Sequence, residues 1–399
     1  MVLSLLLALA ALPAAPQAPE DPGPHLAGWR DVVFQDAIFG QGTIRGRIYY
    51  PATAAGQGAP PDPAAGPYPL AGFQHGWLGR PSSYDALCLH LASWGFVVAS
   101  TGTETGLFPD TYQYARDTRS LLHWTEQQGA AALSWLSGMV EQGGDWPVVG
   151  HSMGGGTLSL LIGIEPRVRT IVGLQAAATD AYGNANVAAF TGRAYWIAGS
   201  VDWVVPSATV HAWFDRARAA ERNVFWEIQG MGHVGCTDTP GSGDPLPGAE
   251  QHRLHRRLVA GLLRADVRGE EDLWRELIGQ GFAAEPSRQQ SRCALPPLWA
   301  VPDPAGAALD TGLAALPNQP ALLAWSLVPD QVPTAYGLLG LSPPDLSVYF
   351  QARLAGEGTA LVPLPLAASW SGHTLYVQGL GLHPGGGGAL SRTAAVPVP

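Results

Sequence analysis

The chain has 399 residues, and 22 basic against 32 acidic side chains give it a formal net charge of −10. Nucleic-acid-binding domains need a basic footprint, so this balance argues against nucleic acid as a partner. A single core rarely grows beyond about 250–300 residues, so the length predicts two domains. The charged fraction is only 14%, with 50 glycines and 35 prolines, which predicts a compact protein with many turns.

Residues 1–18 have the pattern of a signal peptide. The apolar run from Met1 to Leu12 is followed by small residues and prolines, and it is too short to span a membrane. We therefore expect export to the periplasm or out of the cell, with cleavage near Ala15 to Ala18. The alternative is a hydrophobic N-terminal helix. No later segment reads as transmembrane.

Strand and helix patterns alternate over residues 22–293, which we assign to a catalytic domain. The alternation predicts an α/β fold with a mostly parallel sheet covered by helices on both faces. Before the central motif the predicted strands are 31–34, 42–50, 68–74 and 96–100, and the predicted helices are 82–94, 111–126 and 130–141.

The segment from Trp146 to Gly156 carries the most informative motif. A short apolar run ends in Gly150-His151-Ser152-Met153-Gly154, and a Leu-rich helical stretch follows at once. In this strand–turn–helix context a G-x-S-x-G pattern places the serine on a strained turn, and the glycines leave room for it. The pattern predicts that Ser152 is a nucleophile, whereas the alternative is an ordinary glycine-rich turn.

An acid and a base follow in the order of the alpha/beta hydrolases. Asp202 comes just after the predicted strand 193–199, and His233 just after the predicted strand 223–229. Active sites of open parallel sheets form at these strand ends. We therefore expect Ser152, Asp202 and His233 to form a catalytic triad. Asp180, which follows another predicted strand, is the alternative acid.

The loop after the predicted strand 68–74 normally supplies one donor of an oxyanion hole, and the amide after the nucleophile supplies the other. We therefore assign this role to the backbone N–H groups of Trp77 and Met153, and expect His75 to orient the loop. Only residues 175–192 separate the strand before Gln175 from the strand before Asp202, which is too little for a cap domain. The predicted site is an open cleft that permits bulky or polymeric esters. No metal-ligand spacing or cofactor motif is present.

Composition changes after the third cysteine. Residues 294–319 are rich in Pro, Ala and Gly and predict a linker, and residues 320–399 predict a small β-sandwich with a hairpin or loop at Gly385 to Gly388. Cys88 falls in a helical pattern and is expected to be a buried free thiol. Cys236 and Cys293 could form a disulfide in an oxidising compartment, the alternative being that all three thiols are reduced.

Residues 46–236 resemble the bacterial cutinase-like and polyester-hydrolase branch of the alpha/beta hydrolases. They also resemble its dienelactone-hydrolase, chlorophyllase and platelet-activating-factor acetylhydrolase relatives. The segments that carry the resemblance are Ile48 to Pro51, Gln74 to Trp77, Leu91 to Val98, Gly150 to Gly155, Asp202 to Pro206 and Gly232 to Cys236.

The resemblance implies the same triad and the same oxyanion donors. It also implies that Trp77 lines the ester subsite, and we add Trp203 as a second candidate substrate contact. The chain departs from the polyester hydrolases after the strand that follows the nucleophile helix. Those enzymes usually carry a tryptophan there, and this chain has Gln175-Ala-Ala-Ala178. The departure argues against aromatic polyesters as substrates.

The sequence thus predicts a secreted, monomeric serine hydrolase of carboxylic esters that needs no cofactor or metal. Its substrates would be short-chain esters or esters in polymers or lipids. A lipase or phospholipid-acyl hydrolase of the same fold is the first alternative. The second alternative belongs to another class, a secreted binding or surface protein whose β domain is the functional part.

Overall fold

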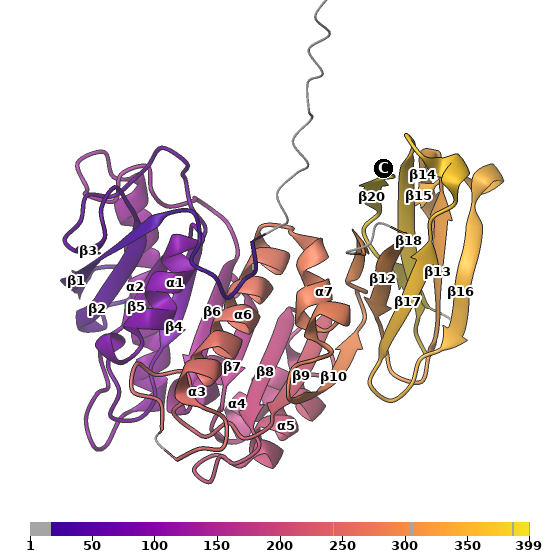
Figure 1. The fold of residues 1–399 in the computed structure, drawn as a ribbon. Coiled ribbons are helices and arrows are strands. Elements are labelled where there is room, and N and C mark those ends of the chain that lie inside the picture. The colour runs from indigo at the N-terminus through magenta and orange to yellow at the C-terminus, as the bar shows by residue number, and fades with distance from the viewer. Residues whose placement is uncertain (1–16, 242, 304–306, 385–386, 399) are drawn as a thin grey trace, which may run out of the picture.

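The computed structural model describes residues 17–241, 243–303, 307–384 and 387–398. A ten-stranded sheet runs through its larger part (Figure 1). The strand order is β10-β9-β8-β7-β6-β4-β5-β2-β1-β3. In chain order the strands are β1 (Leu26–Asp36), β2 (Gly42–Ala52), β3 (Gly56–Gln57), β4 (Leu70–Gln74), β5 (Val97–Thr101), β6 (Trp146–His151), β7 (Val168–Leu174), β8 (Arg193–Gly199), β9 (Arg222–Ile228) and β10 (Ser287–Cys293). Most of the expected signal peptide lies outside the described residues.

The six strands from β9 to β5 are parallel, and antiparallel strands border this block on both sides. Every residue of β4, β5 and β6 is buried, because helices cover both faces of the sheet. Successive side chains along β6 point to opposite faces of the sheet, so Val148 packs into one apolar cluster and Val149 into the other. The predicted parallel sheet is confirmed.

The helices divide between the two faces of the sheet. The helices α1 (Asp85–Ser93), α6 (Gly248–Val267) and α7 (Trp274–Leu277) contribute to one apolar cluster. Helices α2 (Thr111–Ala130), α3 (Met153–Leu161), α4 (Ala181–Ala189) and α5 (Ser207–Arg216) contribute to the other. Only α4 lies between β7 and β8, so no cap is inserted there. None of the helices in the described part of the chain has the length and apolar character needed to cross a bilayer.

The predicted second helix at 130–141 is wrong. Helix α2 continues to Ala130, and the residues that follow form turns as far as a single bridge at Val140. Ala131 has extended dihedral angles, and Gly138 has a φ of +75°, so the backbone cannot continue as a helix there. The apolar residues Leu136 and Met139 are nevertheless buried, which explains why their spacing suggested a helix.

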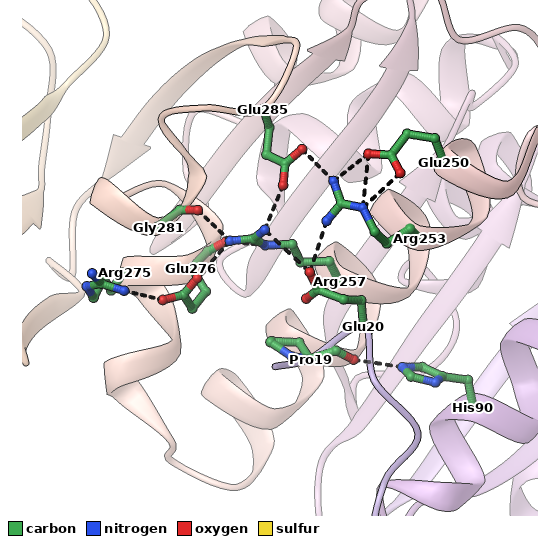
Figure 2. A network of polar contacts seen from close by, with 10 residues as sticks. All are labelled: Pro19, Glu20, His90, Glu250, Arg253, Arg257, Arg275, Glu276, Gly281 and Glu285. Carbon is green, nitrogen blue, oxygen red and sulfur yellow. Dashed lines mark hydrogen bonds and ion pairs between the residues drawn. The ribbon is translucent and has the colours of Figure 1, made fainter. Parts of the chain in front are cut away.

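Residues before the predicted start of the domain are attached to it by polar contacts (Figure 2). The carboxylate of Glu20 lies 2.9 Å from Arg253 and 3.5 Å from Arg257, both on α6. The ring of His90 on α1 donates from Nε2 to the Pro19 carbonyl at 2.7 Å. The other carboxylates on the two arginines are those of Glu250, Glu276 and Glu285. The domain therefore includes the chain from Pro19 onward.

The C-terminal region is β-rich and lies beyond β10 at one end of the large sheet (Figure 1). Its sheets have the orders β11-β12-β17 and β16-β13-β18-β19, with β20 on β18, and β14 pairs with β15. The strands are β11 (Leu298–Pro302), β12 (Ala308–Ala314), β13 (Pro320–Ser326), β14 (Pro329–Thr334), β15 (Gly337–Leu341), β16 (Ser347–Arg353), β17 (Thr359–Pro365), β18 (Thr374–Leu382), β19 (Gly388–Leu390) and β20 (Ala394–Pro397). One apolar cluster receives residues from both larger sheets.

The predicted linker over 294–319 is wrong, because it contains strands β11 and β12. Trp299 of β11 is fully buried in the core beside the large sheet and donates from Nε1 to Gln280 at 2.8 Å. Asp310 of β12 accepts hydrogen bonds from Arg275 of α7 at 2.7 and 3.0 Å. These contacts join the two parts of the chain, so the segment is a packed interface and not a spacer.

The predicted disulfide between Cys236 and Cys293 is also wrong. Both are free thiols, and Cys88 is a buried free thiol as expected. Cys293 ends β10, opposite Arg222 of β9. Cys236 lies instead against Ala86 and Leu87 at the start of α1, where it lines a small cavity with side chains of α6. The two cysteines therefore belong to different regions of the core, and burial raises the pKa of each thiol.

Candidate active site

Ser152 lies on a tight turn between β6 and α3, as the motif predicts. Its φ of +53° and ψ of −118° are rare for a residue with a side chain, a conformation that costs about 1–3 kcal/mol. A Cβ at Gly150 would lie 2.5 Å from the carbonyl oxygen of Gly154, and one at Gly154 would overlap the backbone at the end of β4. Glycine is therefore required on both sides of the serine for the turn to close.

The three residues predicted as a triad lie within hydrogen-bonding distance of one another. Nε2 of His233 is 2.9 Å from the Ser152 hydroxyl, and Nδ1 of His233 is 2.7 Å from Oδ2 of Asp202. The other carboxylate oxygen of Asp202 accepts from the amides of Val204 and Val205 at 2.9 and 2.8 Å. A carboxylate only accepts, so the proton of the neutral ring lies on Nδ1 and Nε2 is free to accept from Ser152.

The alternative acid, Asp180, lies elsewhere. Its side chain accepts from the amide of Gly183 and caps the N-terminus of α4, and its other oxygen accepts from the hydroxyl of Tyr112. Capping this helix gives Asp180 a structural role, which accounts for an aspartate after β7 that is not the partner of His233.

The loop after β4 lies directly against the serine. A Cβ at Gly76 would be 3.2 Å from Cβ of Ser152. In the part of the chain that the structure describes, the N–H groups of Trp77 and Met153 have no hydrogen-bond partner. Both are therefore available to a substrate oxygen. His75 is fully buried, its ring nitrogens lie 2.8 and 2.9 Å from the carbonyl oxygens of Gly76 and Thr103, and burial lowers its pKa. A neutral ring can donate to one of these carbonyls and so orient the loop.

Sequence reasoning missed a buried tyrosine beside the site. The hydroxyl of Tyr84 lies 2.8 Å from Nδ1 of His151 and accepts from the Gly76 amide at 2.9 Å. The other ring nitrogen of His151 lies 2.8 Å from the carbonyl oxygen of His233. The histidine within the elbow motif gave a partial signal, since a polar ring at the end of a buried strand needs partners. Nothing in the sequence around Tyr84 marks it.

Exposed apolar side chains come from loops that end at the same edge of the sheet. Phe108 is 96% exposed, Trp203 is 87% exposed, and Trp77 and Leu107 are more than half exposed. Trp77 donates from Nε1 to the Leu107 carbonyl at 3.1 Å, so the loops after β4 and β5 are joined. We call these four residues the apolar rim. Sequence reasoning found the two tryptophans and missed Leu107 and Phe108, which stand in a polar loop without periodicity.

The position where polyester hydrolases usually have a tryptophan is not aromatic in this chain. Gln175 is buried and turns inward, with its amide nitrogen 3.3 Å from Nε2 of His255 and 3.3 Å from the sulfur of Met231. Ala178 is exposed nearby. Residues 175–178 therefore present no ring at the position of the expected tryptophan.

A comparison with protein-family models matches residues 22–242 to the family described as PET hydrolase-like. The match spans more than half of the chain and includes Ser152, Asp202 and His233. A comparison with curated proteins finds no match.

Proposed function

We propose that this chain, which belongs to the PET hydrolase-like family, is a secreted serine hydrolase of carboxylic esters that works through an acyl-enzyme on Ser152. The family indicates an ester hydrolase. The observation that supports the serine mechanism is the continuous chain of hydrogen bonds from the Ser152 hydroxyl through His233 to Asp202.

In the proposed reaction His233 accepts the Ser152 proton at Nε2 while the serine oxygen attacks the ester carbonyl. The N–H groups of Trp77 and Met153 stabilise the oxyanion that forms, and one such donor typically contributes about 3–4 kcal/mol to lowering the barrier. The C–O bond to the alcohol then breaks, and the alcohol leaves with the proton from His233. Water, deprotonated by His233, attacks the acyl-enzyme, and the bond to Ser152 breaks as His233 returns the proton to the serine oxygen and the acid is released.

The apolar rim and the lack of a cap favour esters presented by a large or insoluble substrate. Exposed aromatic side chains beside a nucleophile can pack against aliphatic chains, and burying such surface contributes about 25 cal/mol per Å². The expected tryptophan after β7 is replaced by Gln175-Ala-Ala-Ala178, so we propose aliphatic polyesters or short-chain esters before aromatic ones. A lipase or phospholipid-acyl hydrolase would use the same residues.

The signal-peptide pattern supports export. Cleavage at or before Ala18 would leave Pro19 and Glu20 in place, and the contacts of these two residues hold the N-terminal segment against α1 and α6.

The test is a panel of soluble chromogenic esters of increasing acyl length, run together with films of aliphatic and aromatic polyester. The Ser152→Ala variant should lose all turnover and keep the wild-type melting temperature. Wild-type activity in this variant would refute the serine mechanism. A folded wild-type chain that hydrolyses no ester but adsorbs to films would support a binding role instead.

The rim is tested separately with Phe108→Ala and Trp203→Ala. Each should lower hydrolysis of films while leaving turnover of a short soluble ester unchanged, because neither side chain contacts the reacting atoms. Leu133→Ala is a matched control, since Leu133 is fully exposed on the turn region after α2 and outside the rim. Equal film activity in all three variants would contradict a role for the rim in substrate contact.

A further inference from the structure

We propose that Tyr84 and His151 are positioning residues, which form a hydrogen-bonded bridge holding the oxyanion loop, the nucleophile turn and the His233 loop in one arrangement. The proposal rests on the function proposed above, because it concerns the same site. The bridge runs from the Gly76 amide to the Tyr84 hydroxyl at 2.9 Å, on to Nδ1 of His151 at 2.8 Å, and from Nε2 of His151 to the His233 carbonyl at 2.8 Å.

The chemistry of the groups fixes the direction of every hydrogen bond in the bridge. The His233 carbonyl only accepts, so Nε2 of His151 carries a hydrogen. His151 is buried, and burial lowers its pKa to about 3, so the ring is neutral and Nδ1 is an acceptor. The Tyr84 hydroxyl must then donate to Nδ1 and use a lone pair for the Gly76 amide. Each donor in the bridge thus meets an acceptor.

The neutral state of His151 matters because its ring lies close to the base. The ring centroids of His151 and His233 are 5.0 Å apart. A charged His151 would oppose the positive charge that His233 acquires when it takes the serine proton. The bridge satisfies both nitrogens of His151 without charge, so the imidazolium forms beside a neutral neighbour.

Two tyrosines also hold the two amides that directly precede the candidate oxyanion donor. The His75 amide donates to the Tyr114 hydroxyl at 2.6 Å, and the Gly76 amide donates to that of Tyr84. Both tyrosines are buried. The next amide is that of Trp77, which has no partner among the described residues and is our candidate oxyanion donor. Tyr84 therefore holds the peptide unit directly before the donor, and a shift there would turn the Trp77 N–H away from the oxyanion.

The test is Tyr84→Phe, which removes the hydroxyl and keeps the ring. Tyr50→Phe is the matched control, because the Tyr50 hydroxyl is also buried and donates to a backbone carbonyl, that of Ala59, at 2.9 Å away from the site. Active sites are counted by titration with a fluorophosphonate, and kcat and KM are measured with a soluble short-chain ester and normalised to that count.

We expect Tyr84→Phe to lower kcat per titrated site by about tenfold or more with little change in KM, because the lost alignment affects the transition state more than substrate binding. Tyr50→Phe should keep the wild-type kcat even if its melting temperature falls. Wild-type kcat per site in Tyr84→Phe would overturn the proposal, since its hydroxyl would then serve stability alone.

A second variant covers the case in which Tyr84→Phe does not fold. His151→Met keeps a long side chain but can make neither the hydrogen bond to Tyr84 nor the one to the His233 carbonyl, so it should show the same loss of kcat. Wild-type kcat in this variant would also overturn the proposal. Failure of the fluorophosphonate to label the folded wild-type protein would refute the proposed function instead, which keeps the two outcomes distinct.

Discussion

Replacing Asp202 by asparagine is a sharp test of the catalytic geometry, because the structure dictates how the new amide must turn. One oxygen of Asp202 accepts from the amides of Val204 and Val205, and the other faces Nδ1 of His233. If the NH₂ group of asparagine faced the two backbone amides, two buried donors would lose their acceptor, at about 1–3 kcal/mol each. The asparagine oxygen therefore stays on the backbone, and the NH₂ group faces His233.

This orientation reverses the tautomer of His233. Nδ1 of His233 must accept from the amide, so the ring proton moves to Nε2 and points at Ser152 instead of leaving Nε2 free to accept. In the Ser-His-Asp template the wrong tautomer lowers kcat by about 10⁴. At about 1.4 kcal/mol per factor of ten this corresponds to roughly 5.5 kcal/mol of barrier. Turning the amide over would restore the tautomer but would break both backbone hydrogen bonds, at about 1–3 kcal/mol each, which is a cost of the same order. We expect the same loss in Asp202→Asn.

The assay is kcat for a soluble chromogenic ester, with folding checked by thermal unfolding. Asp180→Asn is the matched control, because Asp180 is the other acid that follows a parallel strand and asparagine is an equally good helix cap. It should retain wild-type activity. A kcat for Asp202→Asn within tenfold of wild type, or a large loss in Asp180→Asn, would refute the assignment of Asp202 as the partner of His233.

Two further predictions concern the N-terminal segment. Burial lowers the pKa of His90 to about 4, from an ordinary value near 6.5, so the unfolded chain binds a proton between these pH values that the folded protein does not. The free energy of unfolding therefore decreases as the pH falls from about 6.5 to 4, because the unfolded chain takes up a proton at His90 and the folded protein does not. The amide of His90→Gln can still donate to Pro19 but does not titrate. Between pH 7 and 5 the free energy of unfolding of this variant should therefore fall by about 2 kcal/mol less than that of wild type. Urea unfolding at both pH values measures this, and equal losses would contradict it. Glu20→Gln removes the charge facing Arg253 and Arg257 and should cost about 1–2 kcal/mol in urea unfolding at pH 7 without changing kcat, whereas unchanged stability would show that the remaining carboxylates suffice.

The contacts among the three residues of the proposed triad could be predicted from the sequence because each residue follows from local rules. The turn at Ser152 requires small neighbours within two residues, and Asp202 and His233 directly follow apolar strands whose carboxyl ends meet at one edge of the sheet. The chain order then assigns the roles. No contact between distant side chains had to be known in advance.

The bridge and the domain interface depend on such distant contacts and were not predicted. Tyr84 and His151 are 67 residues apart, and a single hydroxyl aimed at a ring has no periodicity. Trp299 stands among prolines and alanines, so composition suggested a linker although the ring fills the core of the other domain. The predicted disulfide of Cys236 had the same weakness, because spacing along the chain does not tell how far apart two thiols lie within a core.

The proposed catalytic residues and the proposed substrate contacts can be tested separately for a physical reason. Ser152 and Asp202 are buried, and their positions depend on backbone geometry that tolerates little change. Phe108 and Trp203 are almost fully exposed, so they contribute little to folding, and surface substitutions of this kind usually change stability by less than about 0.5 kcal/mol. Activity on a short soluble ester is expected to depend on Ser152 and Asp202, whereas activity on a film is expected to depend on Phe108 and Trp203 as well. A variant of the rim that changes the ratio of these two activities has therefore altered contact with the substrate and not the catalytic machinery.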